Sequence, residues 1–297
     1  MLAAYALTEP GSGSDALAAR TTAVLNEANT HYVLNGTKMW ITNAGFADIF
    51  IVFAKVDGEK SKFSAFIVEK EFSGVSTGVE EHKMGIKGSS TRMLNLDNVP
   101  VPVENLIGEV GGGGKIALNI LNIGRFKLGG GVTGGMKLAL NHSLKYAMER
   151  VQFGVPIVSF GLIQSKLAEM CMNTYVAETM VYRTAGLIEA ALADVDVNDT
   201  RTYLRRIEEY STECSIMKVY CSELLDAVVD EGVQILGGMG YSAEYPLERA
   251  YRDSRINRIF EGTNEINRMV AIGQLLRKAM GGKLPIIPIL QEITVDA

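Results

Sequence analysis

Hydrophobic and polar positions follow one pattern in the first third of the chain and another pattern in the remainder. Up to about residue 108 the apolar runs are short, as in DIFIVFAKV, FSAFIVEK and TRMLNLDNVPV, and turn-like segments separate them. Short apolar runs bounded by Gly, Asn, Asp and Pro are typical of β-strands. We therefore expect residues 1–108 to form an antiparallel β domain, a barrel or a sandwich.

Two features refine this expectation. Asn35-Gly36 stands between two apolar runs in HYVLNGTKMWIT, and an Asn-Gly pair in that position is a strong signal for a two-residue hairpin turn. Pro100 and Pro102 are expected to end the strand that begins near Thr91, because proline lacks the N–H that a sheet requires.

After Gly111–Gly114 the apolar residues recur at spacings of three and four, which is the pattern of amphipathic helices. We expect an all-α bundle over residues 109–282, then a Pro-broken tail over 283–297. The chain as a whole is expected to have an α+β fold. The predicted helices lie at residues 116–150, at 162–193, from Tyr203 to Leu236, with Asn198, Asp199 or Thr200 available as a cap before it, and within Arg255 to Met280.

Composition excludes several classes of protein. The 297 residues include 29 Lys and Arg against 34 Asp and Glu, a formal net charge of −5 without a basic block, so nucleic acid is not an expected ligand. No apolar run approaches the ~18 residues that a membrane helix needs. The start of the chain lacks the features of a signal peptide.

Cysteine and histidine spacing adds two expectations. Cys171, Cys214 and Cys221 form no CxxC pair and are typical of reduced thiols. We accordingly expect a cytoplasmic protein, or a mitochondrial-matrix one if the source is eukaryotic. The three histidines are far apart in sequence, so we expect no metal site.

Several segments carry candidate chemistry, and each has a structural alternative. In LTEPGSGSDA, hydroxyls and glycine N–H groups could hold an anionic or carbonyl-rich ligand, or form only a polar turn. Trp40, beside Thr42, could wall a flat aromatic cofactor or belong to the core. Two glycine patterns, Gly11–Ala16 and Gly129–Gly134, lack the strand–helix setting of a dinucleotide site. Residues Gly129–Gly135 are instead expected to allow close helix packing around a ligand or a partner.

The second half offers three more segments. Arg150 in RVQFG could bind a phosphate or be a solvated charge. QILGGMGY could cap a helix or let a ligand approach the backbone. Glu261 in RIFEGTNEINR follows Ile259 and Phe260, and apolar neighbours would raise its pKa toward that of a general base. The alternative is a glutamate ahead of a helix that Thr263 or Asn264 caps.

Taken together, the order and separation of these segments resemble the acyl-CoA dehydrogenase family. The matching segments are LTEPGSGSDA, KMWITNAG, MGIKGSSTRMLNLDNVPVPVENLIG, ERVQFG, QILGGMGY and IFEGTNEINR. The resemblance extends from about Ala3 to Lys278, and FGLIQSKLAEM resembles the very-long-chain branch. The all-helical domain with which the family begins is not in this chain.

The resemblance implies an FAD-dependent oxidoreductase of fatty acid β-oxidation that converts an acyl-CoA thioester to the trans-2-enoyl-CoA. Glu261 would remove the α-proton, and the β-hydrogen would leave as a hydride to flavin N5. The implied partners are an acyl-CoA substrate, an electron-transfer flavoprotein and further copies of the chain in a dimer or tetramer. The alternatives are an acyl-CoA oxidase, or a truncated fragment that folds and oligomerises without FAD.

The resemblance also assigns site residues. Flavin contacts within one subunit would come from Leu7, Thr8, Ser14, Trp40, Thr42, Thr263 and Glu265. Flavin contacts from a neighbouring subunit would come from Arg150, Phe153, Gln164, Gln234 and Gly238. Substrate contacts would come from Ser14, Asn122, Arg125 and Gly262.

Overall fold

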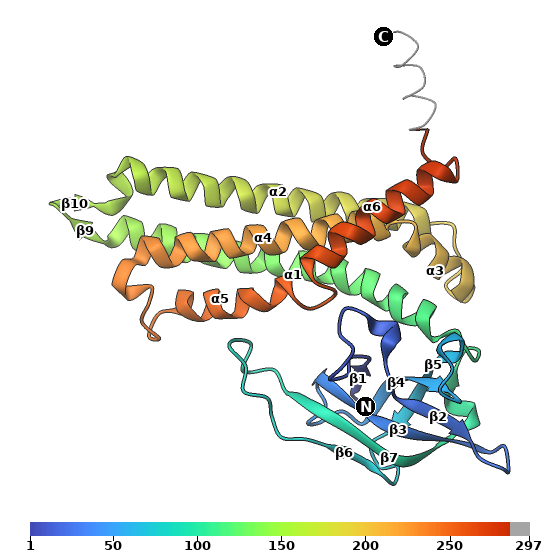
Figure 1. The fold of residues 1–297 in the computed structure, drawn as a ribbon. Coiled ribbons are helices and arrows are strands. Elements are labelled where there is room, and N and C mark those ends of the chain that lie inside the picture. Colours follow the sequence, from blue (N-terminus) through green and yellow to red (C-terminus); the bar gives the residue numbers. More distant parts are fainter. Residues whose placement is uncertain (286–297) are drawn as a thin grey trace. The chain divides into compact units, whose positions relative to one another are not determined.

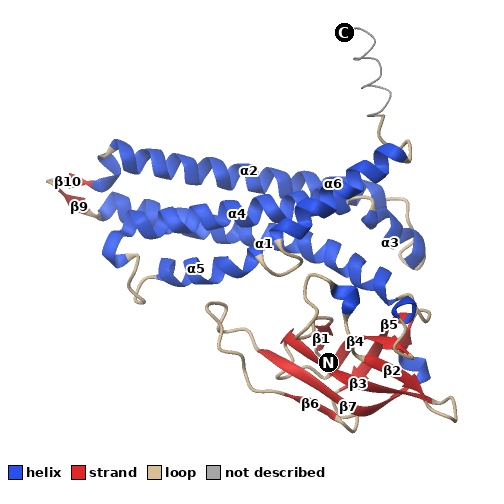
Figure 2. Ribbon diagram, viewed as in Figure 1, coloured by secondary structure: helices blue, strands red, loops and turns tan. Residues whose placement is uncertain are grey.

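The computed structural model describes residues 1–285, which divide into two compact units (Figure 1). The first unit, Met1–Ile120, holds the main sheet and the first residues of α1 (Gly113–Glu149), and the unit from Leu121 onward is mainly helical (Figure 2). The expected α+β fold, a β domain followed by a helical domain, is confirmed. The domain bounds 1–108 and 109–282 stay a prediction, and most of the predicted tail lies outside the described residues.

The first unit contains one eight-stranded sheet with the order β6-β7-β3-β2-β4-β5-β8, in which β1 also pairs with β4. Its described path is open between β6 and β8, so the barrel expected as one alternative is not closed. The strands are β1 (Ala3–Ala6), β2 (Thr22–Leu25), β3 (His31–Thr42), β4 (Ile49–Val56), β5 (Phe63–Glu69), β6 (Val75–Thr77), β7 (Thr91–Pro102) and β8 (Leu106–Ile107).

The sheet is mixed, whereas a purely antiparallel sheet was expected. Both β1 and β2 run parallel to β4, where β1 pairs with Ile49–Val52 and β2 pairs with Lys55 and Val56. The two strands therefore lie one after the other along β4. The chain between them, residues 7–21, leaves the sheet and carries most of the LTEPGSGSDA segment.

The hairpin predicted at Asn35-Gly36 is wrong, because β3 continues through both residues as one strand of 12 residues. A Cβ on Gly36 would lie 2.4 Å from Thr21 Oγ1 and 2.9 Å from Thr21 Cα. A glycine is therefore required at position 36 because two backbones approach closely there, and not because the chain turns. The turn before β3 comes earlier, where Asn26 Oδ1 accepts hydrogen bonds from the N–H groups of Thr30 and His31.

The expected end of β7 at its prolines is only partly right, because the strand passes through Pro100 and ends at Pro102. Pro100 pairs with Val33 of β3, while the neighbour on the other side, β6, pairs only with residues 94–96. This part of β7 is an edge of the sheet, where a missing N–H is tolerated.

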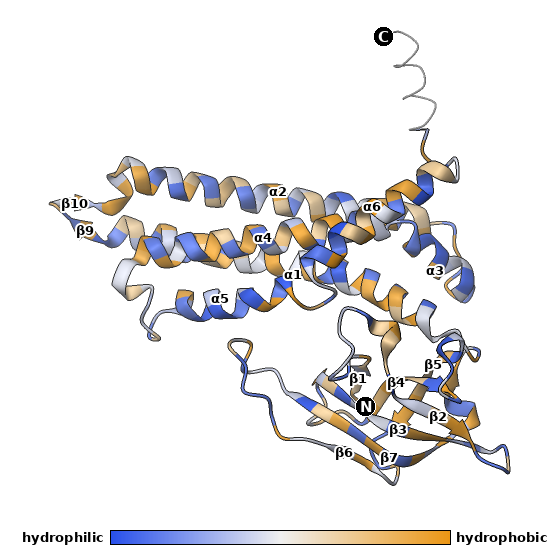
Figure 3. Cartoon of the chain, in the orientation of Figure 1, coloured by the Kyte–Doolittle hydropathy of each residue, from blue (hydrophilic) through white to orange (hydrophobic). Residues whose placement is uncertain are grey.

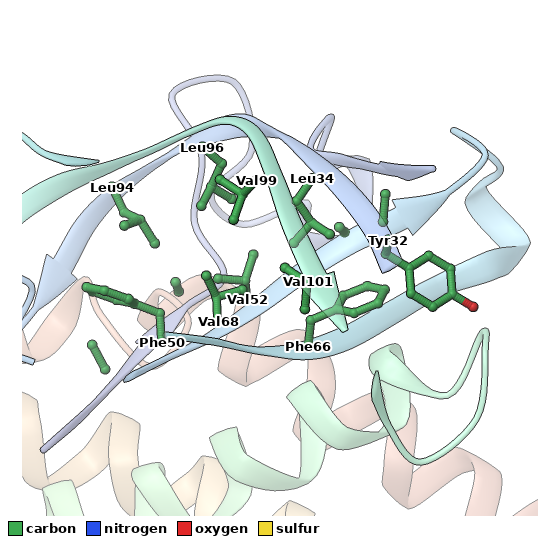
Figure 4. Close-up of a cluster of buried hydrophobic side chains, with 14 of the residues drawn as sticks. Tyr32, Leu34, Phe50, Val52, Phe66, Val68, Leu94, Leu96, Val99 and Val101 are labelled. Atoms are coloured by element: carbon green, nitrogen blue, oxygen red, sulfur yellow. The ribbon is translucent and has the colours of Figure 1, made fainter. Parts of the chain in front are cut away.

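Inward-facing side chains of β3, β4, β5 and β7 form the core of the first unit (Figure 4). Phe50, Val52, Phe66 and Val68 have no measurable exposure. Tyr32 and Phe66 meet edge to face, with ring centroids 5.1 Å apart, a favoured aromatic geometry. The core thus fixes the strands from which the candidate cofactor-facing residues project.

The helical unit confirms most of the predicted helices and corrects one. The predicted helix Tyr203 to Leu236 is two helices that break at Glu209 and Tyr210, and Asp199 caps the first of them through the N–H of Thr202. A helix over 246–254 was not expected. The helices are α1 (Gly113–Glu149), α2 (Gly161–Leu192), α3 (Thr200–Glu208), α4 (Ser211–Leu236), α5 (Pro246–Ser254) and α6 (Asn264–Met280).

Apolar side chains of α1, α2 and α4 share one core, and hydrophobic and polar positions alternate around α2 (Figure 3). The glycine-rich stretch of α1 faces α4: a Cβ on Gly129 would lie 3.0 Å from the Met217 side chain, and one on Gly135 would lie 3.3 Å from Leu225. These two glycines therefore let α1 pack closely against α4 within the unit, and packing around a ligand or a partner stays a prediction.

Candidate active site

Glu261 stands on a tight turn directly before α6. Its backbone has φ +58° and that of Gly262 has φ +79°, a left-handed conformation that costs free energy for any residue with a side chain. Thr263 then caps α6 by accepting a hydrogen bond from the N–H of Ile266 at 3.3 Å. The strained residue is thus the one that the sequence marked as the candidate base.

The Glu261 carboxylate lies against the backbone of α1 at Gly124. A Cβ added to Gly124 would lie 2.4 Å from Oε2, 2.7 Å from Cδ and 2.9 Å from Oε1 of Glu261. Any larger residue at position 124 would therefore displace the carboxylate. This glycine was not among the sequence candidates, although it directly precedes Arg125 in the LNIGR segment.

Three side chains hold the backbone of the Glu261 turn. Arg125 Nε donates to the Glu261 carbonyl at 3.2 Å, and Lys218 Nζ donates to the Gly262 carbonyl at 2.7 Å. Asn267 Nδ2 lies within 2.8–3.2 Å of the carbonyl oxygens of residues 261, 262 and 263. A turn fixed at three successive carbonyls keeps the carboxylate in one place before any ligand arrives.

Further hydrogen bonds support these donors. Lys218 also donates to Asn264 Oδ1 at 2.7 Å, and Asn264 Nδ2 donates to Ser222 Oγ at 3.1 Å. Arg125 Nη1 donates to Asn122 Oδ1 at 3.1 Å. Lys218 and its partner Asn264 are at most 2% exposed. Among the proposed substrate contacts, the structure therefore brings Asn122, Arg125 and Gly262 together with Glu261.

Lys218, Asn264 and Asn267 were missed as site residues in the sequence. Lys218 did carry a signal, because it falls on the apolar face of α4 with Cys214 four residues before it and Cys221 three residues after it. A lysine on the buried face of a helix requires a partner.

The electrostatics of this group favour a carboxyl that holds its proton more tightly than usual. Burial raises the pKa of Glu261, while the positive charges of Arg125 and Lys218 act in the opposite direction. Burial, together with the charge of Arg125, lowers the pKa of Lys218 to about 8. A carboxylate with a raised pKa is a stronger base, which is what abstraction of a weakly acidic C–H proton requires.

In the first unit, two candidate segments lie side by side. The N–H of Met39 donates to the Thr8 carbonyl at 2.8 Å, which joins the Leu7–Ser14 segment to the last part of β3. The register of β3 shifts between Lys38 and Ile41, and Trp40 inside this bulge has φ +61°. The shift turns Trp40, 53% exposed, and the exposed Thr42 outward, while Ile41 enters the core.

These groups suit a flavin. In the described part of the chain, the hydroxyls of Thr8, Ser14 and Thr42 have no hydrogen-bond partner, and Cβ atoms on Gly11 and Gly13 would meet nothing within 4 Å. Free hydroxyls and accessible N–H groups match the acceptor-rich edge of an isoalloxazine ring, and the open face of Trp40 matches its plane. Leu7, by contrast, is buried, so its side chain is not available to a ligand.

The five candidates for contacts with a neighbouring subunit gather at one end of the helical unit. Phe153 and Gly154 form the tip of a hairpin between β9 (Val151–Gln152) and β10 (Val155–Pro156), with φ +52° and +83°, which leaves Phe153 94% exposed. The other members, Arg150, Gln164, Gln234 and Gly238, are also exposed.

An ion pair between Lys166 and Glu231 joins the start of α2 to the end of α4, where Gln164 and Gln234 lie. Gln234 is 16 residues after Lys218 on α4, about 24 Å along the helix axis. The structure therefore does not bring this group to Glu261. Thr263 and Glu265, in contrast, belong to the Glu261 turn and the first turn of α6.

Two absences concern the described residues only. Within residues 1–285 no three His, Cys, Asp or Glu side chains are grouped as a metal site would require. None of the helices in that range is long and apolar enough to cross a membrane.

Comparisons with known proteins agree with the geometry. Residues 4–99 match the family model "Acyl-CoA dehydrogenase, middle domain", and residues 111–276 match "Acyl-CoA dehydrogenase, C-terminal domain". A probable acyl-CoA dehydrogenase of Bacillus subtilis is 60% identical over 98% of this chain and 49% of its own length. The human mitochondrial very long-chain specific acyl-CoA dehydrogenase is 44% identical over 90% of this chain and 40% of its own length.

A crystal structure of an acyl-CoA dehydrogenase complexed with FAD, from Bacillus anthracis, superimposes with a TM-score of 0.96 at 59% identity. The match covers 99% of this chain and 50% of that one. This chain thus spans about half the length of the relatives that it matches. On both family models and these relatives, the chain belongs to the acyl-CoA dehydrogenase family.

Proposed function

We propose that the protein of which this chain is part carries out FAD-dependent α,β-dehydrogenation of a fatty acyl-CoA thioester to the trans-2-enoyl-CoA. The observation that carries the proposal is the Glu261 turn, where a carboxylate with a raised pKa lies against Gly124 and three buried side chains donate hydrogen bonds to the backbone carbonyls of the turn. The acyl-CoA substrate follows from the names of the B. subtilis and human relatives.

Glu261 is the group that takes the α-proton. An α-hydrogen of a thioester is weakly acidic, so a carboxylate with the ordinary pKa of ~4.3 is a poor base for it. Burial raises the pKa of Glu261 and so brings it closer to the pKa of the α-hydrogen. The fixed turn also removes the cost of orienting the carboxylate during the reaction. FAD, when bound, supplies the acceptor for the hydride that leaves the β-carbon.

The remaining assignments follow the same proposal. Trp40, Thr42 and the Leu7–Ser14 segment hold the flavin ring within one subunit, with Thr263 and Glu265. Arg125, Asn122, Gly262 and Ser14 contact the substrate. Arg150, Phe153, Gln164, Gln234 and Gly238 reach the FAD of a second copy in a homodimer or homotetramer.

The proposal also covers partner and compartment. Electrons leave to an electron-transfer flavoprotein, as the family resemblance implies. The cysteines Cys171, Cys214 and Cys221 are free thiols, which favours a reducing compartment, the cytoplasm in a bacterial cell.

The test is to add FAD to the purified chain, remove excess cofactor and oxygen, and follow visible flavin absorption after adding a long-chain acyl-CoA. We expect bound flavin whose absorption bleaches on addition. Flavin that binds and does not bleach would contradict the dehydrogenation, and a chain that retains no flavin would favour the alternative of a fragment that folds without FAD. Hydrogen peroxide formed in air at the rate of turnover would identify an oxidase instead.

A further inference from the structure

A buried ion pair lies beneath the two segments that face the proposed flavin. Lys38 of β3 has no exposed side-chain surface, and Glu9, on the segment after β1, is 8% exposed. Lys38 Nζ donates to Glu9 Oε1 at 2.8 Å, to the Phe53 carbonyl at 2.6 Å and to the Leu7 carbonyl at 3.2 Å. All three ammonium hydrogens therefore have acceptors.

The Glu9 carboxylate is equally well satisfied. Oε1 accepts hydrogen bonds from the N–H of Thr21 at 3.0 Å and from its hydroxyl at 2.5 Å, and Oε2 accepts from the N–H of Arg20 at 2.5 Å. Burial opposes ionisation of Glu9, but these donors and Lys38 outweigh it and lower its pKa. Glu9 thereby connects both ends of the segment that leaves the sheet between β1 and β2.

The same pair fixes the outward-facing side of this segment. Lys38 holds the Leu7 carbonyl, and the next residue, Met39, binds the Thr8 carbonyl through its N–H. Glu9 and Ser12 exchange two backbone hydrogen bonds of 3.0 Å, which close the turn at Pro10 and Gly11. The buried Glu9–Lys38 pair thus holds the backbone of the segment that carries the accessible glycines and hydroxyls.

Lys38 also stands at the start of the bulge that turns Trp40 outward. Its bond to Phe53 ties that point of β3 to β4. An apolar residue of similar length would fill the space but could not bind the carbonyls of Leu7 and Phe53. A buried ion pair is weak evidence for stability, because replacing one with apolar residues is often neutral, so a positioning role explains its presence better.

We propose that Glu9 and Lys38 are positioning residues that hold the Leu7–Ser14 segment and the Trp40–Thr42 segment in the arrangement that binds the flavin. This inference rests on the proposed function. It assigns the pair no contact with the cofactor, because both side chains point away from solvent into the first unit.

The test compares the wild-type chain with two variants, Lys38→Met and Glu9→Gln. Glu9→Gln is the milder change, because glutamine has the size of glutamate and keeps one side-chain oxygen that can accept hydrogen bonds. FAD affinity is measured by flavin fluorescence, and hydrogen exchange is measured on the FAD-free chains. We expect Lys38→Met to weaken FAD binding about tenfold, the size expected when charge-assisted hydrogen bonds are lost. Exchange should rise in residues 7–14 and 39–42, while strands β4 and β5 stay protected.

The control is Lys62→Met, which removes the exposed ion pairs of Lys62 with Asp57 and Glu59 in the same unit. Its FAD affinity and its hydrogen exchange should match those of the wild type.

Two results would overturn the inference. One is FAD affinity and local exchange in both variants equal to those of the wild type. The other is a loss of protection over the whole sheet in both variants, which would make the pair a support of the fold and not of the site. A wild-type chain that binds no FAD would instead contradict flavin binding by this chain, on which the inference rests, and the affinity of the unmutated chain shows this before any variant is made.

Discussion

Gly124 is the residue on which the position of the Glu261 carboxylate depends most directly. Gly124→Ala would place a Cβ 2.4 Å from Oε2, so we expect the dehydrogenation rate to fall about 100-fold, the cost of misplacing a reacting group by ~1 Å. Gly131→Ala on the same helix is the control, because its Cβ would meet nothing within 4 Å. It should gain up to ~1 kcal/mol of stability from helix propensity. Equal rates in the two variants would contradict the role of Gly124.

The charge of Lys218 is expected to affect the pH dependence of kcat. Its charge favours the ionised form of Glu261, so Lys218→Met should raise the pKa of Glu261 and move the acid limb of the pH–kcat profile to higher pH. The difference from the wild type should be largest below about pH 8, where Lys218 is protonated. Lys137→Met, which breaks the exposed pair with Glu178, should leave the profile unchanged. An acid limb that does not move in Lys218→Met would show that this charge has no effect on the base.

The sequence pointed to the proposed base, Glu261, and to one of the side chains that hold its turn, Arg125, but not to the other two. Glu261 stood out because of its place in a specific motif, whereas Lys38 and Lys218 are single lysines, and a lysine in isolation is usually a solvated charge. The position of such a lysine within its strand or helix shows whether its side chain faces the core. Lys38 follows Tyr32 and Leu34 on the inward side of β3, and inward lysines are rare enough to be noticed. Gly124 could not be found in this way, because its importance comes from a residue 137 positions later.

At the scale of elements, the connection between β6 and β7 is stabilised by Glu80. Its carboxylate accepts hydrogen bonds from Ser90 Oγ at 2.7 Å, Arg92 Nε at 2.7 Å and the N–H of Thr91 at 2.9 Å. The bonds from Ser90, Arg92 and Thr91 lower the pKa of Glu80 to about 2. Glu80 therefore contributes stability that is fully present above the unfolded-state pKa of 4.5 and is lost as the pH falls toward about 2.

Glu80→Gln tests this pH dependence. The variant should melt at a lower temperature than the wild type near neutral pH, and the difference in Tm should shrink as the pH is lowered from about 6 to about 2. Circular dichroism measures both proteins across that range. Glu59→Gln, at an exposed pair with Lys62, is the matched control. A Tm difference for Glu80→Gln that is constant with pH would refute the account of this connection.

The elements that sequence predicted best are those whose pattern is local. The periodic helices α1, α2 and α6 were expected near their observed bounds, and Asp199 was among the expected caps. The hairpin at Asn35-Gly36 failed because a local turn signal cannot reveal that Thr21 packs against Gly36. The parallel pairing of β1 and β2 with β4 was also missed, since strand direction depends on contacts between distant segments.

At the scale of the whole molecule, the exposed hairpin at Phe153 and the Glu261 turn belong to different parts of the helical unit. If Arg150 acts on the flavin of a second copy, then Arg150→Met and Glu261→Gln should each be inactive, while co-refolded mixtures of the two should regain activity. Random pairing in a dimer leaves one intact site in half of the dimers, so about a quarter of wild-type activity is expected. A mixture as inactive as its components would place Arg150 in the same subunit as the flavin it contacts.

If Glu261 removes the α-proton, the Glu261→Gln variant should not reduce its flavin, and the rate of flavin reduction in this variant tests the assignment. The variant and the wild type are loaded with FAD and mixed anaerobically with a long-chain acyl-CoA in a stopped-flow spectrometer. We expect Glu261→Gln to bind FAD as the wild type does, because no flavin contact is assigned to Glu261, and we expect its flavin absorption not to bleach. Bleaching of the variant at the wild-type rate would contradict the assignment and remove Glu261 from the reaction.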